Sequence, residues 1–422
     1  MMRNADETMH HPPFRGSVAL FYHFFHPDDV VSARLFTDLA KDLAQRGWQV
    51  TVHTSNRLWS NPHACLATGT EHWAGVQIIR TARPGLEQGR YFPRLLNALW
   101  LMLGWTRQVL RSSRPDLFLV GTDPQFSQLL LPLLRLAAPR ARIVWWCFDL
   151  YPEAIAADQP GGWLAALARG AARLLGPLYR LVDLAVDIGP CMRARLATHK
   201  WRRTPLTLTP WALVEPATPT PPDPELRLRL FGPGCRLALL YSGTLGRAHD
   251  FTLFLELMRR LRRIDPGIRL LFSCRGNRLA ALRAAVQPED DNILFAPFAD
   301  EKELAARLAA ADIHLLSLNP EWDGIVVPSK FFGSLATGRP LLYAGSATSS
   351  IGQWIDTLDV GFRVEATNMD AVVAHLLALA QNPTELERLQ HDAFTVYHRH
   401  FSRRLILERW DDALKKLLGF RS

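Results

Sequence analysis

Residues 323–330, with the sequence DGIVVPSK, have the composition of an anion-binding site. Pro328 and Ser329 favour the start of a helix, and Lys330 would follow in its first turn. The N-terminus of a helix presents unpaired N–H groups and about half a positive charge, so a lysine and a serine hydroxyl there suit a diphosphate. Lys330 is also one of only six lysines among 49 basic residues. The alternative is an ordinary junction beside a helix with a surface lysine.

A glycine-containing segment upstream, directly after an apolar run at 237–241, could bind the same anion. Gly243 and Gly246 would let the backbone approach a phosphate closely, and Arg247 could make a two-pronged contact with its oxygens. Arg275 follows the next apolar run. We therefore expect basic residues and glycines at successive strand ends of one domain, with Lys330 among them.

Short apolar runs that alternate with longer helical patterns must position these residues. Continuous apolar strands separated by helices are typical of parallel sheets covered on both faces. The sequence therefore predicts an α/β fold with two Rossmann-like, doubly wound parallel-sheet domains that face a cleft at their strand ends. The predicted strands are 18–25, 49–54, 76–80, 117–121, 143–148, 184–188, 206–209, 237–241, 269–273, 293–296, 313–317, 340–344 and 361–364.

Five prolines in the stretch 216–224 predict a linker between the two domains. We expect an N-terminal domain at 1–215, a C-terminal domain at 225–397, and a last helix at 398–422 that crosses back to the N-terminal domain.

Other classes of site are less well supported. The five cysteines are scattered, so neither a disulfide framework nor a zinc site is indicated. No Asp-x-Asp motif follows a predicted strand, and Asp290 and Asp291 lie in a polar turn, so we expect no metal and no cofactor. The apolar run at 18–25 is far shorter than the ~20 residues that span a bilayer, so it predicts a strand and not a signal peptide, in a cytoplasmic protein.

The net charge of +9 lies entirely in the N-terminal half. Residues 1–210 contain 24 Lys and Arg against 15 Asp and Glu, whereas residues 211–422 contain 25 of each. Such asymmetry indicates an acidic partner, which is nucleic acid, anionic lipid or a phosphorylated substrate, unless it reflects a general bias toward arginine.

Two apolar segments in that half carry arginines among aromatic and long aliphatic residues. One runs from Arg90 to Arg114 and includes Arg94, Trp100 and Arg107; the other is 163–180. This composition describes helices that lie on an anionic membrane surface. The alternative is that both are buried helices with exposed arginines.

Three motifs resemble a known family: Tyr-Ser-Gly-x-x-Gly at 241–246, Val-Pro-Ser-Lys at 327–330 and Leu-Ala-x-Gly-Arg-Pro-Leu at 335–341. The N-terminal half agrees through His-Pro-Asp-Asp at 26–29 and Asp-Leu-Tyr-Pro-Glu at 149–153. Together they resemble family 4 glycosyltransferases with the GT-B fold, and most closely the WbuB-like bacterial envelope-polysaccharide group. The resemblance covers roughly residues 17–415.

This resemblance implies transfer of a sugar, with retention of configuration and without a metal, from a nucleotide-diphosphate-sugar donor to a polyprenyl-diphosphate-linked saccharide. The N-terminal domain would bind the acceptor, the C-terminal domain the donor. No nucleic acid is implied, and the enzyme would be peripheral on the inner face of the cytoplasmic membrane. The catalytic residues would be Asp149, Glu153, Arg247 and Lys330. The donor-binding residues would be Gly243, Gly246, Arg247, Arg275, Glu321, Asp323, Pro328, Ser329 and Lys330.

The sequence departs from the family at two glutamates, whose places hold Ile325 and Gly333. Neither residue can bind a sugar hydroxyl, so Glu321 or Asp323 would have to take over. Asp149 could also act only as a cap of the following helix. Two alternatives therefore stay open: a nucleotide-sugar 2-epimerase of the same fold, and a non-catalytic partner in a polysaccharide assembly complex.

Overall fold

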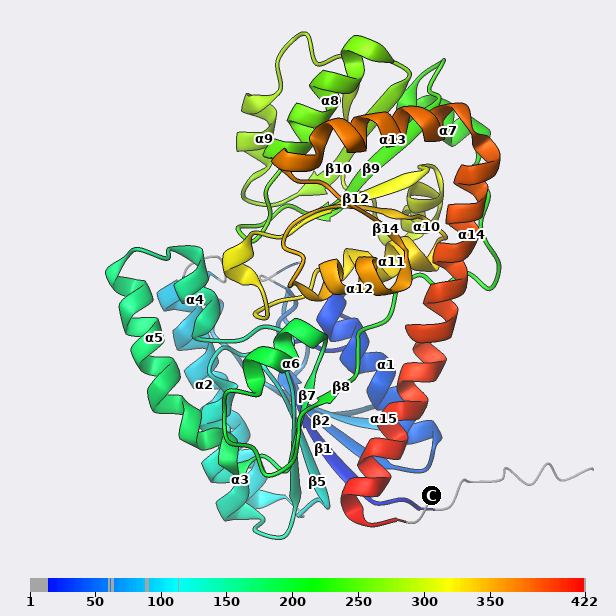
Figure 1. The fold of residues 1–422 in the computed structure, drawn as a ribbon. Helices are drawn as coiled ribbons and strands as arrows, with labels where there is room; N and C mark the ends of the chain where they lie inside the picture. Colours follow the sequence, from blue (N-terminus) through cyan, green and yellow to red (C-terminus); the bar gives the residue numbers. More distant parts are fainter. Residues whose placement is uncertain (1–13, 60, 62–63, 88–90, 113, 421–422) are drawn as a thin grey trace, which may run out of the picture.

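The computed structural model describes residues 14–59, 61, 64–87, 91–112 and 114–420, and Figure 1 shows them as two α/β domains, one above the other. The lower domain contains an eight-stranded sheet with the order β3-β4-β2-β1-β5-β6-β7-β8. Its neighbouring strands are parallel except for β3 and β4. The strands are β1 (Ser17–Phe21), β2 (Gln49–Ser55), β3 (Gly69–Trp73), β4 (Val76–Thr81), β5 (Leu117–Gly121), β6 (Arg142–Trp146), β7 (Leu184–Asp187) and β8 (Leu206–Thr207).

The upper domain contains a six-stranded, fully parallel sheet with the order β11-β10-β9-β12-β13-β14. Its strands are β9 (Leu237–Thr244), β10 (Ile268–Arg275), β11 (Ile293–Ala296), β12 (Ile313–Ser317), β13 (Leu341–Ala344) and β14 (Gly361–Arg363). The predicted pair of doubly wound sheets is therefore confirmed, and each predicted strand has a counterpart. Strand β3 was not predicted, because four of its five residues are exposed and no apolar run marks it.

Helices connect the strands and cover both sheets (Figure 1). They are α1 (Val31–Gln45), α2 (Tyr91–Arg111), α3 (Leu131–Ala137), α4 (Glu153–Asp158), α5 (Trp163–Leu175), α6 (Pro190–Leu196), α7 (Pro224–Phe231), α8 (Thr252–Ile264), α9 (Leu279–Ala285), α10 (Glu301–Ala309), α11 (Lys330–Ala336), α12 (Ser350–Leu358), α13 (Met369–Gln381), α14 (Pro383–His400) and α15 (Arg403–Leu418). Within the described ranges, no helix is both long enough and apolar enough to cross a bilayer.

The last two helices join the domains. Helix α14 begins in the upper domain and α15 ends against the lower one (Figure 1). In the lower domain the buried Asp411 of α15 accepts hydrogen bonds from Trp48 Nε1 at 2.8 Å and from Arg15 Nη1 at 2.7 Å. The Trp410 ring packs 4.8 Å from that of Trp146. Helix α15 therefore contributes to the core of the lower domain.

Loops that follow the strands of the two sheets meet between the domains. The Leu150 N–H, after β6, donates to the Ile325 carbonyl, after β12, at 3.2 Å. Arg195 of α6 donates to the Asp323 carbonyl at 2.9 Å. The carboxyl ends of both sheets therefore face one another, and this is the arrangement that positions the candidate residues.

Candidate active site

Lys330 is the first residue of α11, and its side chain runs beneath the end of β9. Its ammonium Nζ donates to the Thr244 carbonyl oxygen at 2.7 Å and to the Tyr241 hydroxyl at 2.9 Å. Gly243 makes this path possible: its φ is +121°, and a Cβ there would lie 2.5 Å from Lys330 Cε. The glycine that was predicted to admit a phosphate thus makes room for the lysine.

The charge of Lys330 has no internal counter-ion. No Asp or Glu in the described part of the chain forms an ion pair with it, and both hydrogen-bond acceptors of its Nζ are neutral. Burial lowers the pKa of the Lys330 ammonium to about 7. An anion placed beside this group would favour its charged form. The site therefore has an unsatisfied preference for negative charge.

Two further residues at this site were not identified from the sequence. They are Tyr241, which accepts the hydrogen bond from Lys330, and His249, whose Nδ1 lies 2.6 Å from the Ser317 carbonyl oxygen. Burial, together with Lys330, lowers the pKa of His249 to about 3, so the imidazole is neutral at pH 7. Tyr241 is the first residue of the Tyr-Ser-Gly-x-x-Gly motif, but its contact with Lys330 joins residues 89 positions apart and is not visible in the sequence.

Helix α11 begins at Lys330, directly after Pro328 and Ser329, as predicted. Ser329 is the residue at the N-terminal cap, without a side-chain hydrogen bond to the helix, and the preceding Pro328 is buried. Helix α11 ends at Ala336, and Gly338 follows the C-terminal cap residue Thr337 with a φ of +70°.

Arg247 lies in the loop after β9, and its side chain forms an ion pair with Asp158 of α4 in the lower domain. Its guanidinium is about half exposed. Contact between Arg247 and a diphosphate stays a prediction, and it requires this arginine to share or exchange its partner. A Cβ at Gly246 would meet no atom within 4 Å, so space adjoins this loop.

The remaining donor-side candidates lie around this loop. Arg275 ends β10, which neighbours β9, and its guanidinium lies 4.2 Å from the centre of the Phe298 ring. Glu321 is exposed, and among the described residues it forms no ion pair with Lys330. In Asp323, Oδ2 accepts a hydrogen bond from Thr348 at 3.3 Å, while Oδ1 is buried and has no partner among the described residues.

The two residues that depart from the family, Ile325 and Gly333, lie in different surroundings. Ile325 is buried, and its carbonyl accepts the interdomain hydrogen bond from Leu150. Gly333 lies in the middle of α11, where a Cβ would meet only Leu308, at 3.8 Å. A side chain is therefore sterically tolerated at 333, and the glycine is not required by the fold.

Asp149 and Glu153 lie in different surroundings. Asp149 is exposed, yet neighbouring protein atoms displace water from its carboxylate, and this desolvation raises the pKa of Asp149 to about 6. The positive charge of Arg94 lowers this pKa, whereas the negative charge of Asp123 raises it. Glu153 is partly buried near Tyr179 and Arg195, and its Oε2 has no partner in the described ranges. The interpretation of Asp149 as a helix cap is wrong, since Pro152 caps α4 and no side chain bonds to that end.

Asp149 belongs to a polar cluster at neighbouring strand ends that was not recognised in the sequence. His23, after β1, contacts Asp123, after β5, with 3.1 Å between Nδ1 and Oδ1. Burial opposes ionisation of Asp123, but His23 and Arg94 hold the pKa of Asp123 below its usual value. Arg94 of α2 reaches the Tyr151 hydroxyl at 3.4 Å.

The position of Arg94 corrects one prediction. Arg94 was predicted on a membrane-facing surface of its helix, but it points toward Tyr151 because the apolar outer face of α2 is formed by other residues. Arg90 lies outside the described residues. Arg107 is exposed, as the membrane interpretation requires.

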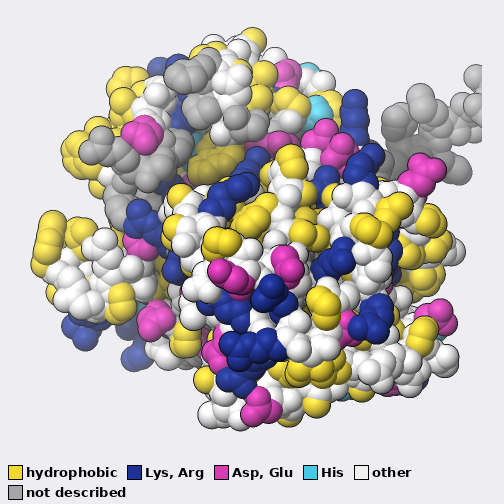
Figure 2. Space-filling view, turned by 90° about the horizontal axis from the view of Figure 1, so that it is seen from above, with side chains coloured by type: hydrophobic (Ala, Val, Ile, Leu, Met, Phe, Trp, Pro, Cys, Tyr) yellow, Lys and Arg dark blue, Asp and Glu magenta, His cyan; other side chains and the backbone are white. Residues whose placement is uncertain are grey.

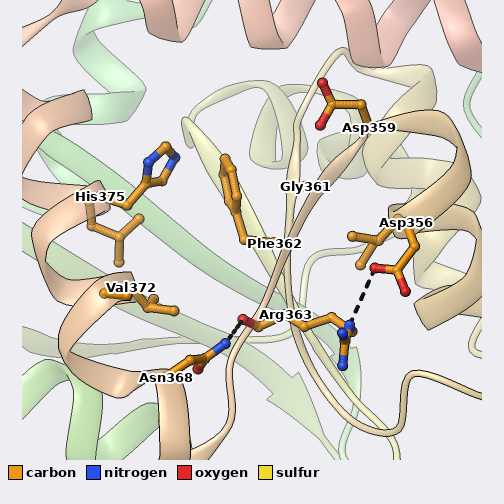
Figure 3. Close-up of a pocket in the computed structure, with 11 residues that line it drawn as sticks. Asp356, Asp359, Gly361, Phe362, Arg363, Asn368, Val372 and His375 are labelled. Carbon is orange, nitrogen blue, oxygen red and sulfur yellow. Dashed lines mark hydrogen bonds and ion pairs between the residues drawn. The ribbon is translucent and has the colours of Figure 1, made fainter.

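A pocket of about 420 Å³ lies elsewhere, beside the edge strand β14 (Figure 3). Arg363 contacts Asp356 there at 3.4 Å, and Asn368 donates to the Arg363 carbonyl at 3.0 Å. None of the predicted site residues lines this pocket. In the portion of the chain that the structure describes, no group of three or more His, Cys, Asp or Glu side chains is placed to hold a metal ion.

Comparisons with known proteins agree with this architecture. Residues 32–212 match the family model described as "Glycosyl transferase 4-like domain". The chain is 23% identical over 317 residues to the "Probable glycosyltransferase WbjE" of Pseudomonas aeruginosa, an alignment that covers 73% of this chain and 76% of that protein.

Solved structures show the same fold. Sucrose-phosphate synthase from Thermosynechococcus elongatus superimposes with a TM-score of 0.73 at 16% identity, covering 96% of this chain and all of that one. HepE of Anabaena in complex with UDP and glucose superimposes with a TM-score of 0.65 at 11% identity. WaaG, "a glycosyltransferase involved in lipopolysaccharide biosynthesis", superimposes with a TM-score of 0.62 at 15% identity. Each of these two alignments covers 95% of this chain and the whole of the other chain. The chain thus has the GT-B fold, and its residues 32–212 match the model of the glycosyl transferase 4-like domain.

Proposed function

We propose that this protein is a retaining, metal-independent glycosyltransferase of the WbuB-like group. It would move a sugar from a nucleotide-diphosphate-sugar donor to a polyprenyl-diphosphate-linked saccharide in the synthesis of cell-envelope polysaccharide. The observation that carries the proposal is Lys330, an ammonium without a carboxylate partner at the strand ends of the upper domain. A donor such as that of HepE, which was solved with UDP and glucose, would supply the missing negative charge.

The chemistry follows from where charge develops. When the glycosidic bond of the donor breaks, its electrons pass to the leaving diphosphate, and a cation held in advance stabilises that charge most strongly where water is excluded. Lys330 would contact the diphosphate oxygens beside the Gly243–Gly246 loop, with Arg247 as the second cation. The reacting hydroxyl would come from the lower domain, where Asp149 would orient it.

The acidity of Asp149 gives the first testable consequence. If its carboxylate must be ionised to accept a hydrogen bond from the acceptor, protonation below its pKa of about 6 removes that form. We expect kcat/KM to fall about tenfold per pH unit below pH 6. Asp149→Asn should lower the rate at pH 8 and abolish this acid limb. An unchanged limb in the Asn variant would assign the titration to another group.

Catalysis without a metal gives the second testable consequence. We expect sugar transfer to persist in excess EDTA, because Lys330 and Arg247 would neutralise the leaving group. Without an acceptor, hydrolysis of the donor should persist in the same way. Turnover should be compared in EDTA, in EDTA with excess Mg²⁺, and in untreated enzyme. Loss of activity with chelator that Mg²⁺ or Mn²⁺ restores would contradict this part of the proposal.

The surface of the lower domain supports a membrane-bound acceptor. The alternative that α2 and α5 are buried helices with exposed arginines is wrong for their outer sides, because each helix also exposes apolar side chains there. Figure 1 places both helices on one side of the domain, and Figure 2, which looks down from above, shows hydrophobic and basic side chains interspersed over the surface. We call the exposed apolar residues of these two helices the apolar face; they are Phe92, Leu96, Leu99, Trp100, Leu103, Leu110, Trp163, Leu167 and Leu174.

A non-catalytic role in an assembly complex is the second candidate, favoured by Ile325 and Gly333 in place of two glutamates. The two candidates differ in donor turnover. Incubation with labelled nucleotide sugars and bacterial lipid extract should give a labelled lipid product if the protein is a transferase. Binding of a nucleotide sugar without product or released nucleoside diphosphate would favour the non-catalytic role.

A further inference from the structure

Four arginines in the described part of the chain are buried, and two of them, Arg83 and Arg339, differ sharply in their surroundings. Arg83, two residues after β4, and Arg339, two residues before β13, are each 3% exposed. The Arg339 guanidinium donates hydrogen bonds to the carbonyl oxygens of five residues. In Arg83, by contrast, Nε, Nη1 and Nη2 are all buried and have no hydrogen-bond partner among the described residues.

A buried charge without partners is costly, and proteins normally pair such groups. No carboxylate in the described ranges forms an ion pair with Arg83. Burial, with the nearby Arg57, lowers the pKa of Arg83 to about 10, so the guanidinium still carries its charge at pH 7. A group of this kind is expected where an anion from outside the chain completes the contacts.

The position of Arg83 fits a ligand site. Strands β4, β2, β1 and β5 are neighbours in the sheet, and their carboxyl ends deliver Arg83, Arg57, His23 and Asp123 in that order. The Arg57 Nε donates to the Arg83 carbonyl at 2.8 Å, which holds the two arginines together. His23 Nε2 is also buried without a partner in the described part of the chain, while its Nδ1 contacts Asp123. Ligands of parallel sheets bind at such strand ends.

The adjoining helix indicates what kind of anion this is. Arg94, in the first turns of α2, points toward Tyr151 and lies close enough to influence the charges of His23 and Asp123. Phe92 and Leu96, on the same turns, are exposed and belong to the apolar face. One end of α2 therefore offers a cation on one side and an apolar surface on the other, as an anionic headgroup with a lipid tail would require.

We propose that Arg83, with Arg57 and Arg94, binds the diphosphate through which a lipid-linked acceptor carries its saccharide. This inference rests on the proposed glycosyl transfer and adds the residues that recognise the acceptor. The planar guanidinium groups suit two-pronged contacts with phosphate oxygens. Asp123 contacts His23, and within the described residues it forms no ion pair with Arg83, although its charge acts on Arg83 from a longer distance. Free inorganic diphosphate has the same chemistry without the tail.

The test is calorimetric binding of inorganic pyrophosphate and of farnesyl diphosphate to the full chain. It is done in a Lys330→Ala background, so that the donor site does not contribute. We expect Arg83→Met to weaken pyrophosphate binding at least tenfold and Arg83→Lys to weaken it less. Farnesyl diphosphate should bind more tightly than pyrophosphate if the lipid is the source of the anion, and equally if the site accepts any free diphosphate.

Thermal unfolding without ligand separates binding from a structural role. Because Arg83 has no partners to lose, Arg83→Met should keep or raise the Tm, whereas the matched Arg339→Met should lower it. Unchanged pyrophosphate binding in Arg83→Met, or a fall in Tm as large as that of Arg339→Met, would overturn the proposal.

Kinetics distinguish this proposal from the proposed function. In a working transferase, Arg83→Met should raise KM for the acceptor and leave KM for the donor unchanged. If Arg83→Met transfers sugar with an unchanged KM for the acceptor, the diphosphate site is refuted and glycosyl transfer is not. Arg83-dependent pyrophosphate binding by a protein that transfers no sugar would refute glycosyl transfer and the lipid acceptor, and would leave only a diphosphate site.

Discussion

Lys330→Ala is expected to lower kcat/KM by roughly ten- to more than a hundredfold, because a charge-assisted hydrogen bond to a diphosphate oxygen contributes about 1.5–3 kcal/mol. The fold should survive, since the lysine forms no ion pair in the described part of the chain and its Nζ donates there to Thr244 and Tyr241. Steady-state kinetics with the donor varied would measure the effect. Lys416→Ala, an exposed lysine on α15, is the matched control and should behave as wild type.

The pH dependence of donor binding separates Lys330 from its neighbours. The ligand-free ammonium has a pKa lowered to about 7 by burial, so above pH 7 the neutral amine must take up a proton as the diphosphate binds. The Kd of the nucleoside diphosphate should then rise above pH 7 in the wild type and stay constant in Lys330→Arg. Wild-type kinetics in Lys330→Ala would contradict the anion site itself.

Arg247→Ala should also weaken donor binding, but it removes an interdomain contact as well. Its guanidinium pairs with Asp158. Asp158→Asn breaks the same ion pair and leaves the arginine in place. If Arg247 binds diphosphate, only Arg247→Ala should raise the Kd of the donor; equal effects would assign the arginine to domain packing.

Reversible binding to anionic vesicles is the other large expected effect. Each Lys or Arg near an anionic surface contributes about 1 kcal/mol, so Arg107→Gln, Arg111→Gln and Arg169→Gln together should weaken binding by up to about 3 kcal/mol. The effect should shrink at high salt, where the screening length falls from about 10 Å at 0.1 M to about 3 Å at 1 M. Co-sedimentation with vesicles of stated anionic lipid content measures it. Arg94 is left unchanged in this experiment, because it points toward Tyr151.

The apolar part of that surface should bind in a salt-resistant way. Trp100 is 56% exposed and Leu103 59%, so replacing both with Gln should remove the binding that remains at high salt. Matched controls lie in the upper domain: Arg229→Gln and Arg263→Gln for charge, and Leu228→Gln, at 56% exposure, for apolar area. A wild-type protein that stays in the supernatant at low salt, or controls as impaired as the test variants, would remove the support for a membrane-bound acceptor.

The fold was predictable because buried parallel strands are continuous apolar runs. Each such run corresponds to a strand, whereas β3 has the polar sequence GTEHW and left no signal. Helix orientation was harder, since α2 is apolar on more than one side. Trp105 is fully buried and Trp100 is exposed, and composition alone does not distinguish the two.

The candidate site was predictable only where a local motif exists. The glycine and Pro-Ser-Lys segments led to Lys330, and the structure brings it beneath Gly243. The actual partner of Arg247 is Asp158 of the other domain, a contact across 89 positions that no local pattern records. The Arg83 guanidinium has no hydrogen-bond partner among the described residues, and no local sequence pattern predicts this, because it depends on every side chain around it.

The most direct test of the central claim is thermal unfolding of the wild-type chain with a panel of nucleoside diphosphates and their sugar conjugates. A ligand at about 100 times its Kd should stabilise the protein by about 2.7 kcal/mol. We expect nucleotides of one base to raise the Tm in wild type and in Lys416→Ala, and to raise it much less in Lys330→Ala. If no member of the panel raises the Tm, or if Lys330→Ala responds as fully as wild type, the anion site at Lys330 does not bind a sugar donor.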